Sequence, residues 1–411
     1  MLGSGIARRT KKWYAPRFFD IRLRTSNEGS SKMRIGFVST YPPIECGIAT
    51  YTQYLTEALR KKHVDVYIIS HLGGSGDQVF PCFDYEDGDL AEKAFSMMIR
   101  FTPDVVHIQH EFALFGKHQG VSVIPLMVQC RLVGIPVVAT LHTVYPQIPE
   151  NHGILLQSII LNSDRVIIHE AYQEQSLRNL VGDDALKKVS TIPHGAREVT
   201  PIPDAKKILG LPAHKKVILI IGYFRPSKNF ELVIDIFPEI LKGYPEAILV
   251  VAGKIRGKEH IDYRNMLFRK IEDSPKRDRI YLIRGQLPQN VFDTILSAAD
   301  VVVLPYRISS QSGILAHCLA FARPIVTSTT TAMKETLEKS GAGIMCEDTS
   351  QFVESIVRIL SDDNKAKELS KNALSFVQNV ISWSRVAEQH LDIYNKLTDP
   401  PPIQSHVITV E

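Results

Sequence analysis

The feature that most constrains the fold is a series of short apolar, β-branched runs that alternate with longer amphipathic segments, and this series occurs twice. Continuous apolar runs suit strands that are buried on both faces, as in a parallel sheet covered by helices. In the first half the predicted strands are Arg34–Ser39, Val64–Ser70, Val105–Gln109, Val137–Leu141, Arg165–His169 and Val189–Ile192. In the second half they are Val217–Ile221, Ala247–Ala252, Ile280–Ile283, Val301–Pro305 and Ile325–Ser328.

Two such series predict an α/β protein of two Rossmann-like, doubly wound parallel-sheet domains that face each other across a cleft. The chain of 411 residues is long enough for both. We expect domains over 33–200 and 201–380, a C-terminal helix within 381–398, and a flexible tail over 399–411, because three consecutive prolines end the helix. In open α/β sheets ligands bind at the carboxyl ends of the strands, so functional residues are expected in the loops there.

The first 32 residues are set apart by their charge. They hold eight basic and two acidic residues, a net charge of +6, whereas the whole chain carries +4, so residues 33–411 carry −2. The body of the protein therefore lacks the electrostatic footprint of a nucleic-acid-binding protein. The leader fits a disordered tail without chemistry, or a segment for targeting or for contact with an anionic membrane surface.

Apolar runs and cysteines exclude further classes. No uninterrupted apolar run reaches the roughly 18 residues that a membrane span needs. Five cysteines, an odd number without CxxC spacing, argue against a disulfide framework or a zinc cluster and for a reducing cytosol. We therefore expect a cytoplasmic protein, with peripheral membrane contact through residues 1–32 as the open alternative.

The loop after the first strand contains a glycine, Gly47, where the chain enters a helix expected over 52–61. Such a glycine lets a backbone approach an anion at the positive end of a helix. A glycine that serves only the turn fits the residue equally well. Polar residues also end the third and fourth strands, where His110 and His142 are expected at the mouth of the cleft as sugar or phosphate contacts.

The second domain holds the sharper pattern. Its first strand leads through Gly222 into a loop with Arg225 and Lys228, just before a helix that is expected to begin near Asn229. Two cations beside a helix N-terminus form a concentrated positive site for a pair of phosphates. Two solvated surface cations are the alternative interpretation.

Two further loops suit a nucleotide. Small hydroxyl residues and a glycine over 309–314 lie at a helix start and would expose several backbone donors, a second anion-binding nest. The loop 285–287 could present backbone groups to the edge of a base, although a plain loop is as good an explanation. By contrast Asp87-Gly88-Asp89, which has the spacing of a metal-binding DxD, lies in an acidic loop that reads as a solvated turn.

Together these residues make the chain from Met33 to about Leu397 resemble retaining glycosyltransferases of family 4, which have the GT-B architecture. The resemblance rests on Cys46-Gly47-Ile48, His110, Leu141-His142-Thr143, Ile192-Pro193-His194-Gly195, Arg225 with Lys228, and 309–324. It implies a first domain on the acceptor side, a second domain that binds a nucleotide sugar, and a C-terminal helix that crosses back to the first domain.

The resemblance also implies roles for single residues. Arg225 and Lys228 would neutralise the leaving diphosphate, and His142 would lie near the transferred sugar. The donor-binding residues would be Gly47, Gly222, Gly285, Gln286, Leu287, Ser309, Gln311, Ser312, Gly313, Ile314 and His317, with Glu45 and His110 on the acceptor side. The chain departs from the family where two glutamates are usual, eight positions apart. Ser309 and His317 stand there, and they can hydrogen-bond a sugar hydroxyl without a full negative charge.

The function predicted on this basis is transfer of a hexose, mannose or glucose, from a nucleoside-diphosphate sugar to a hydroxyl acceptor such as a glycan or a lipid-linked saccharide. It would proceed with retention at the anomeric carbon and without metal ion or cofactor. Two alternatives stay open. One is a silent binder of nucleotide sugars, suggested by Ser309 and His317. The other is a non-hydrolysing epimerase, which needs carboxylates, for which Glu45, Glu111 and Glu170 are the candidates.

Overall fold

The computed structural model describes residues 32–255, 258–285, 287–309 and 312–399. The leader over 1–31, the tail over 400–411, and two predicted donor contacts, Gln286 and Gln311, lie outside the described residues. The chain divides into the units Met1–Lys32 and Met33–Glu411, and the second contains both predicted domains.

The first domain is built on a seven-stranded parallel sheet with the order β3-β2-β1-β4-β5-β6-β7. Its six predicted strands are confirmed, with small differences at their ends. One strand, β3, was not predicted, because a proline interrupts its short apolar run at the edge of the sheet. The strands are β1 (Arg34–Ser39), β2 (Asp65–His71), β3 (Val79–Phe83), β4 (Val105–His110), β5 (Val137–Leu141), β6 (Arg165–Ile168) and β7 (Val189–Thr191).

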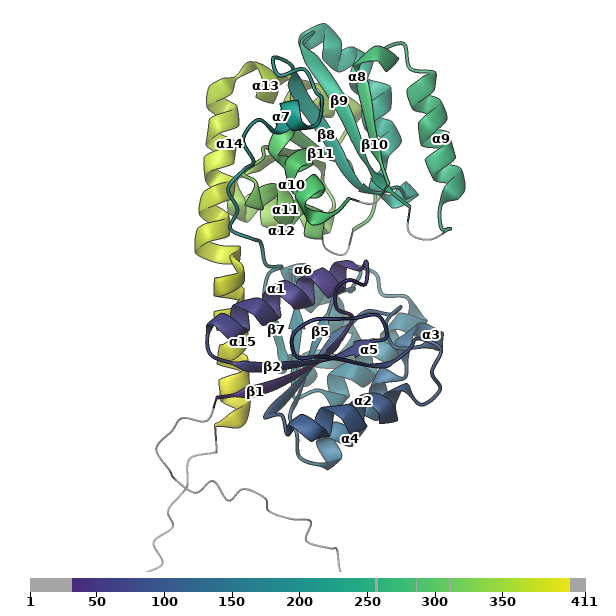
Figure 1. Ribbon diagram of the computed structural model, residues 1–411, viewed down its shortest axis with the longest axis vertical. Helices are drawn as coiled ribbons and strands as arrows, with labels where there is room; N and C mark the ends of the chain where they lie inside the picture. The colour runs from purple at the N-terminus through teal and green to yellow at the C-terminus, as the bar shows by residue number, and fades with distance from the viewer. Residues whose placement is uncertain (1–31, 256–257, 286, 310–311, 400–411) are drawn as a thin grey trace, which may run out of the picture. The chain divides into compact units, whose positions relative to one another are not determined.

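Helices cover both faces of this sheet (Figure 1). On one face α1 packs with the C-terminal helix α15 (Trp383–Thr398), and on the other α2, α4 and α5 lie side by side. The helices are α1 (Gly47–Lys61), α2 (Leu90–Met98), α3 (Lys117–Gly120), α4 (Val123–Leu132), α5 (Glu150–Asn162) and α6 (Ala171–Leu186). Because apolar side chains leave both faces of each central strand, the sheet lies between two hydrophobic cores.

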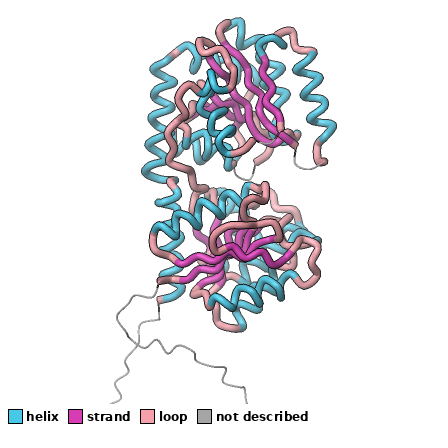
Figure 2. Tube along the Cα trace, viewed as in Figure 1, coloured by secondary structure: helices cyan, strands magenta, loops and turns pink. Residues whose placement is uncertain are grey.

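The second domain repeats this plan of a parallel sheet covered by helices (Figure 2). Its sheet has six strands in the order β10-β9-β8-β11-β12-β13. The five predicted strands are present, and the edge strand β13 was missed. The strands are β8 (Lys216–Tyr223), β9 (Ala247–Lys254), β10 (Ile280–Arg284), β11 (Val301–Leu304), β12 (Ile325–Ser328) and β13 (Gly343–Cys346). The helices are α7 (Ala205–Ile208), α8 (Phe230–Gly243), α9 (Ile261–Glu272), α10 (Gln289–Ala298), α11 (Gly313–Ala320), α12 (Thr331–Ser340), α13 (Thr349–Ser361) and α14 (Asp363–Phe376).

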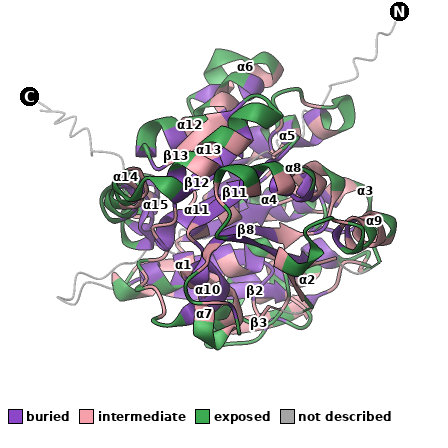
Figure 3. Ribbon diagram, turned by 90° about the horizontal axis from the view of Figure 1, so that it is seen from above, coloured by how far each residue is buried: buried purple, intermediate pink, exposed green. Residues whose placement is uncertain are grey.

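Burial follows this layering. In both domains the central strands are buried, and the helices that cover them turn one face to solvent (Figure 3). Strand β9, for example, is buried at every residue but its last, and β8 is buried over its middle residues. The core therefore fixes the carboxyl edges of the strands, from which the loops of interest leave.

The chain passes between the domains twice, at neighbouring points. Ala196, in the segment after β7, forms a parallel bridge with Ser382, just before α15 (Trp383–Thr398). The backbone N–H of Ala196 donates to the carbonyl of Ile381 at 2.7 Å, and the N–H of Trp383 donates to Ala196 at 3.2 Å. Helix α15 then packs against α1, so the last helix belongs to the core of the first domain.

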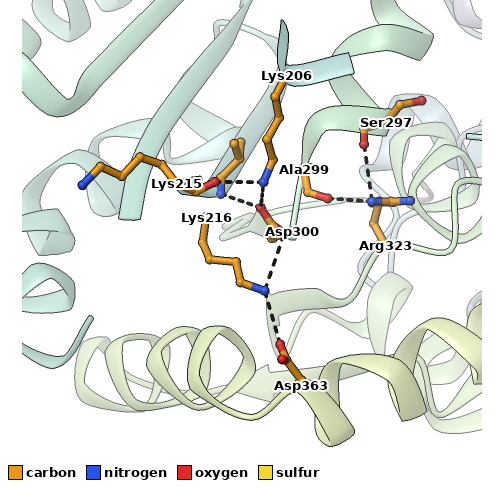
Figure 4. Close-up of polar contacts among 9 residues, drawn as sticks. Lys206, Lys215, Lys216, Ser297, Ala299, Asp300, Arg323 and Asp363 are labelled. Carbon is orange, nitrogen blue, oxygen red and sulfur yellow. Dashed lines mark hydrogen bonds and ion pairs between the residues drawn. The ribbon is translucent and has the colours of Figure 1, made fainter. Parts of the chain in front are cut away.

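At the amino ends of the second sheet, a carboxylate organises the backbone (Figure 4). One oxygen of Asp300 accepts hydrogen bonds from the Lys206 ammonium and from the Val217 N–H, both at 2.7 Å. Lys216 lies between Asp300 and Asp363, 3.9 and 3.3 Å from their oxygens. This network ties α7, β8, β11 and α14 together at the end of the sheet that faces away from the loops of interest.

Candidate functional site

The loops that follow β8 and β11 meet at the carboxyl edge of the second sheet, as predicted for the cationic site (Figure 1). β8 and β11 are neighbours in the sheet, so their loops are adjacent. After β8 the chain makes a short 3-10 turn over Pro226–Lys228, with Arg225 at its start, and α8 begins at Phe230. The backbone thus places Arg225 at the start of that turn and Lys228 at its end.

Lys228 does not point away into solvent. Its Nζ lies 3.4 Å from the centroid of the Tyr306 ring, a cation–π contact with the loop after β11. Burial, together with the neighbouring Arg225 guanidinium, lowers the pKa of Lys228 to about 7. Within the described part of the chain Lys228 forms no ion pair with a carboxylate. Two positive groups therefore share a site where a dianion would relieve their repulsion.

Arg225 contributes a second cation with donors to spare. Its Nε is buried and has no hydrogen-bond partner among the described residues. Its Nη2 lies 3.8 Å from a carboxylate oxygen of Glu259, a side chain that is 65% exposed. Such a long pair with an exposed partner holds the guanidinium weakly. Arg225 is free to offer a fork of N–H groups to an anion.

The start of α11 has the backbone geometry on which the prediction of an anion site was based. Ser312 caps the helix by accepting a hydrogen bond from the N–H of Leu315 at 3.2 Å. Gly313 and Ile314 are the first two residues of the helix, so their N–H groups have no acceptor within it. Ser309 lies partly buried just upstream. The helix start points its donors and its positive dipole end in the way an anion site requires.

The other predicted donor contacts of the second domain also lie at strand ends. Gly222 is the second-last residue of β8 and has φ +146°. Gly285 directly follows β10 and has φ +112°. Leu287 packs partly against the core beside them. The structure therefore gathers these residues at the carboxyl edge.

Gly47 is the first residue of α1 and not part of the loop before it, so the helix begins five residues earlier than predicted. Its φ is not in the left-handed region, and nothing lies within 4 Å of the place a Cβ would occupy. The fold itself does not need a glycine here. This favours the interpretation in which a ligand approaches the backbone over the one in which the turn requires glycine.

His110 and His142 lie at the predicted strand ends, but the expectation that they line the mouth of the cleft is wrong. They are only 1% and 2% exposed. Nε2 of His142 lies 2.8 Å from the Gln109 side-chain oxygen and Nδ1 lies 3.4 Å from Nε2 of His169. Burial, then the neighbouring His169, holds the pKa of His142 well below its ordinary value. Both of its ring nitrogens are thus used inside the protein.

His110 is buried in a different place, between the aromatic rings of Phe112 and Phe115. Neither ring nitrogen has a hydrogen-bond partner among the described residues. Burial lowers the pKa of His110 to about 3, so its ring is neutral. The strand direction at β4 sends this side chain into the core, which the order of residues alone did not reveal.

His317, predicted as a donor-binding residue, lies in the second turn of α11. Its ring packs edge-on against Phe292 at 5.1 Å. Burial, then the nearby Arg197, lowers the pKa of His317 to about 3. Arg197 itself forms two hydrogen bonds with Asp293, at 2.9 and 2.6 Å. At this position the chain therefore offers a neutral imidazole.

The three glutamates considered for proton chemistry all have structural partners. Glu45 pairs with Lys254, and Glu111 accepts from the N–H of Ala113 at 2.8 Å. Glu170 caps α6 and is 7% exposed. Asp87 and Asp89 each lie 3.0 Å from the Lys93 ammonium, so the DxD sequence forms the expected turn before α2.

A cavity between the domains has a volume of about 360 Å³. It is lined from the first domain by His169 and Glu170 and from the second by Ser312, Glu335 and Lys339. In the described ranges, no group of three or more His, Cys, Asp or Glu side chains is arranged to hold a metal ion. None of the helices described is both long and apolar enough to cross a membrane.

Two residues of the site were not singled out from the sequence. Tyr306 supplies the ring beneath Lys228, and Arg307 contacts the Lys228 loop through its backbone and its side chain. The sequence could have indicated both residues, because they follow a buried strand of the second domain directly, as Arg225 does.

Comparison with family models gives two adjacent matches. Residues 46–197 match the model "Glycosyltransferase Family 4", and residues 201–376 match "Glycosyl transferases group 1". Among curated proteins, the phosphatidyl-myo-inositol mannosyltransferase of Mycobacterium leprae is 22% identical over 88% of this chain and 96% of its own length. The D-inositol 3-phosphate glycosyltransferase of Corynebacterium urealyticum is 21% identical over 63% of each protein. Three further relatives are covered over only 46–49% of their length.

Solved structures share the fold at low identity. The sucrose-phosphate synthase of Thermosynechococcus elongatus superposes with a TM-score of 0.72 at 19% identity, covering 89% of this chain and 99% of the other. The Anabaena protein HepE in complex with UDP-glucose gives a TM-score of 0.66 at 14% identity, with coverage of 89% and 100%. The arrangement of two parallel-sheet domains is therefore common to all three proteins.

Proposed function

Because the chain belongs to glycosyltransferase family 4 and has the GT-B fold, we propose that it transfers a hexose from a nucleoside-diphosphate sugar to a hydroxyl acceptor, with retention at the anomeric carbon. The observation that carries the proposal is the pair Arg225 and Lys228 at the carboxyl edge of the second sheet, where Lys228 contacts Tyr306 in the loop that leads to α11. Mannose and glucose are the proposed sugars. They agree with the names of the mannosyltransferase relative and of the UDP-glucose complex.

The proposed mechanism follows from where charge develops. When the bond between the anomeric carbon and the diphosphate breaks, negative charge grows on the leaving oxygens. A guanidinium, an ammonium and helix-start N–H groups stabilise that charge more in the transition state than in the bound donor. Lys228 is well suited, because a diphosphate beside it would raise its pKa and keep it charged.

No protein nucleophile enters the proposed mechanism. A departing phosphate oxygen can accept the proton of the attacking hydroxyl on the same face of the sugar, which gives retention. In this proposal the positive groups of the protein do the work of a metal ion, so turnover is expected without added divalent cations. The acceptor is proposed to be a glycan or a lipid-linked saccharide.

The experiment is a screen followed by substitution. Thermal shift across UDP, GDP and ADP and their hexose derivatives identifies the donor, since a ligand that binds the native state stabilises it. Transfer is then measured with the labelled donor and a panel of acceptors. In Arg225→Ala and Lys228→Ala we expect kcat to fall by about 100-fold or more, which corresponds to the loss of one strong transition-state contact. Unfolding temperatures should stay within a few degrees of the parent.

Lys242→Ala is the matched control, because this lysine is 73% exposed and pairs with Glu239, which is itself 57% exposed. Its kinetics should be unchanged. Parental rates in both site variants would contradict the proposal.

A silent binder is the second candidate, favoured by Ser309 and His317 in place of the two carboxylates. Donor binding by calorimetry together with no transfer or hydrolysis would support it.

A further inference from the structure

The loop after β11 is fastened to the loop after β8 through Arg307. The backbone N–H of Arg307 donates to the carbonyl of Ser227 at 2.9 Å. This bond joins two loops that are 80 residues apart in the chain. It fixes the position of the residue that directly precedes Lys228.

The side chain of Arg307 holds the residue that follows Lys228. Its Nη2 donates to the side-chain oxygen of Asn229 at 3.0 Å and lies 2.9 Å from a carboxylate oxygen of Glu231. Glu231 is also bonded to the hydroxyl of Tyr263, and that hydroxyl accepts from the N–H of Phe230 at 2.9 Å. The Glu231 side chain is 14% exposed, whereas that of Arg307 is 56% exposed.

Asn229 is in the left-handed region, with φ 52° and ψ 45°. Asparagine tolerates this conformation better than most residues other than glycine. The bond from Arg307 to its side-chain oxygen adds a contact that holds the turn. Since Ser227 and Asn229 both bond to Arg307, the backbone of Lys228 is restrained on both sides.

The same loop also supplies the surface on which the ammonium rests. Tyr306, the neighbour of Arg307, is 2% exposed and places its ring 3.4 Å from Nζ of Lys228. Residues 306 and 307 thus hold the backbone and the side chain of Lys228 together. The alternative interpretation, in which Arg225 and Lys228 are solvated surface cations, does not account for these contacts to Lys228.

From these contacts we propose that Arg307 is a positioning residue. It holds Lys228 in its partly buried place beside Arg225, and so keeps the two cations in position to bind an anion. The proposal rests on the proposed function for the meaning of the anion, a nucleoside diphosphate. The positioning itself concerns the protein alone.

The proposal has a measurable consequence. Burial keeps the pKa of Lys228 near 7. Without Arg307 the turn over Asn229 loosens and water reaches the ammonium. Because desolvation is the largest cause of the lowered pKa, the midpoint should move upward, toward the ordinary lysine value.

The test is the pH dependence of acetylation of Lys228 by trace acetic anhydride, read by mass spectrometry on the protein without donor. In Arg307→Met we expect the midpoint to rise by about 1 pH unit, and in Arg307→Lys by less, since one ammonium replaces only part of the fork. Arg269→Met is the control. Arg269 is exposed, and its side chain makes no hydrogen bond or ion pair in the described parts of the chain. A midpoint in both Arg307 variants that equals the parent would overturn the proposal.

Kinetics add a readout that a merely structural role would not move. In Arg307→Met we expect kcat/KM to fall about 10-fold and its alkaline limb, which reports the free enzyme, to shift to higher pH. Should Arg307→Met fail to fold, Arg307→Lys carries both measurements. If the parent shows no transfer at all, the proposed function fails, but the acetylation midpoints still decide whether Arg307 positions Lys228.

Discussion

The backbone of Gly195 lies against the indole ring of Trp383. A Cβ on Gly195 would come within 2.4 Å of a ring carbon, closer than a Cβ atom approaches a non-bonded neighbour in proteins. The contact is at the point where the chain crosses between domains, next to the bridge from Ala196 to Ser382. Since Trp383 is 7% exposed and also packs on Tyr51, the ring has little room to move.

The first prediction is that Gly195→Ala destabilises the protein by about 1–3 kcal/mol, the usual cost of forcing an extra carbon into a packed region. Urea unfolding measures it. Gly88→Ala is the matched control, because Gly88 has nothing within 4 Å of a Cβ and should change stability by no more than about 0.5 kcal/mol. Equal stabilities for the two variants would show that the indole yields.

The second prediction concerns Gly47, where a Cβ meets open space. Alanine at this first position of α1 should leave stability unchanged or slightly raised, since it is the better helix former. If the donor diphosphate approaches the backbone here, the added methyl should lower kcat/KM for the donor by about 10-fold or more. Steady-state kinetics and thermal unfolding on the same preparation test this. Unchanged kinetics would leave the glycine without a role toward the donor.

The third prediction is a pH dependence of stability that arises from Glu170. Burial, then the nearby Glu335 carboxylate, raises the pKa of Glu170 to about 8 from an ordinary 4.5. The folded state therefore favours the protonated form. Its contribution to stability is complete below pH 4.5, shrinks as pH rises, and is lost above about pH 8. One unit of pKa corresponds to about 1.4 kcal/mol, so the loss amounts to several kcal/mol at most.

Glu170→Gln should remove this part of the profile. At pH 9 the variant should be more stable than the parent, and at pH 5 nearly equal, because glutamine resembles the protonated acid. Thermal unfolding between pH 5 and 9 measures both. Glu347→Gln, which changes an exposed glutamate, is the control and should follow the parent throughout. Parallel profiles for Glu170→Gln and the parent would assign the dependence to other groups.

The elements that the sequence predicted well are those fixed by local pattern. Continuous apolar runs identified β8 and β11, and the loop residues Arg225 and Lys228 followed from the rule that sites lie at strand ends. The short edge strands β3 and β13 were missed because a proline interrupts β3 and because β13 has only four residues, the first of them a glycine. Edge strands are stabilised by one neighbour, so their own sequence signal is weak.

The fate of the histidines shows what pattern cannot predict. Gln109, which bonds to His142, also approaches His107, and His107 bonds to Tyr394 from the last helix at 2.6 Å. That contact joins residues 287 positions apart in the chain. Burial of His142 therefore depends on a helix that returns from the far end of the sequence. A strand-end rule gives the position of a side chain, whereas only the packed structure gives its surroundings.

The last prediction concerns Asp300, at the end of the second sheet that faces away from the site (Figure 4). Its carboxylate accepts from Lys206 and Val217 and is 25% exposed. Asp300→Asn keeps the shape but removes the charge, so Lys206 and Lys216 lose their shared partner. We expect a loss of about 1–3 kcal/mol in urea unfolding, reduced from the value for a fully buried pair by partial exposure to solvent. Glu239→Gln, which removes an exposed pair with Lys242, should cost no more than about 0.5 kcal/mol.

Since the network lies far from the strand ends that carry Arg225, donor kinetics of Asp300→Asn below its unfolding temperature should match the parent. A kinetic defect in a stably folded Asp300→Asn would mean that this end of the sheet communicates with the site.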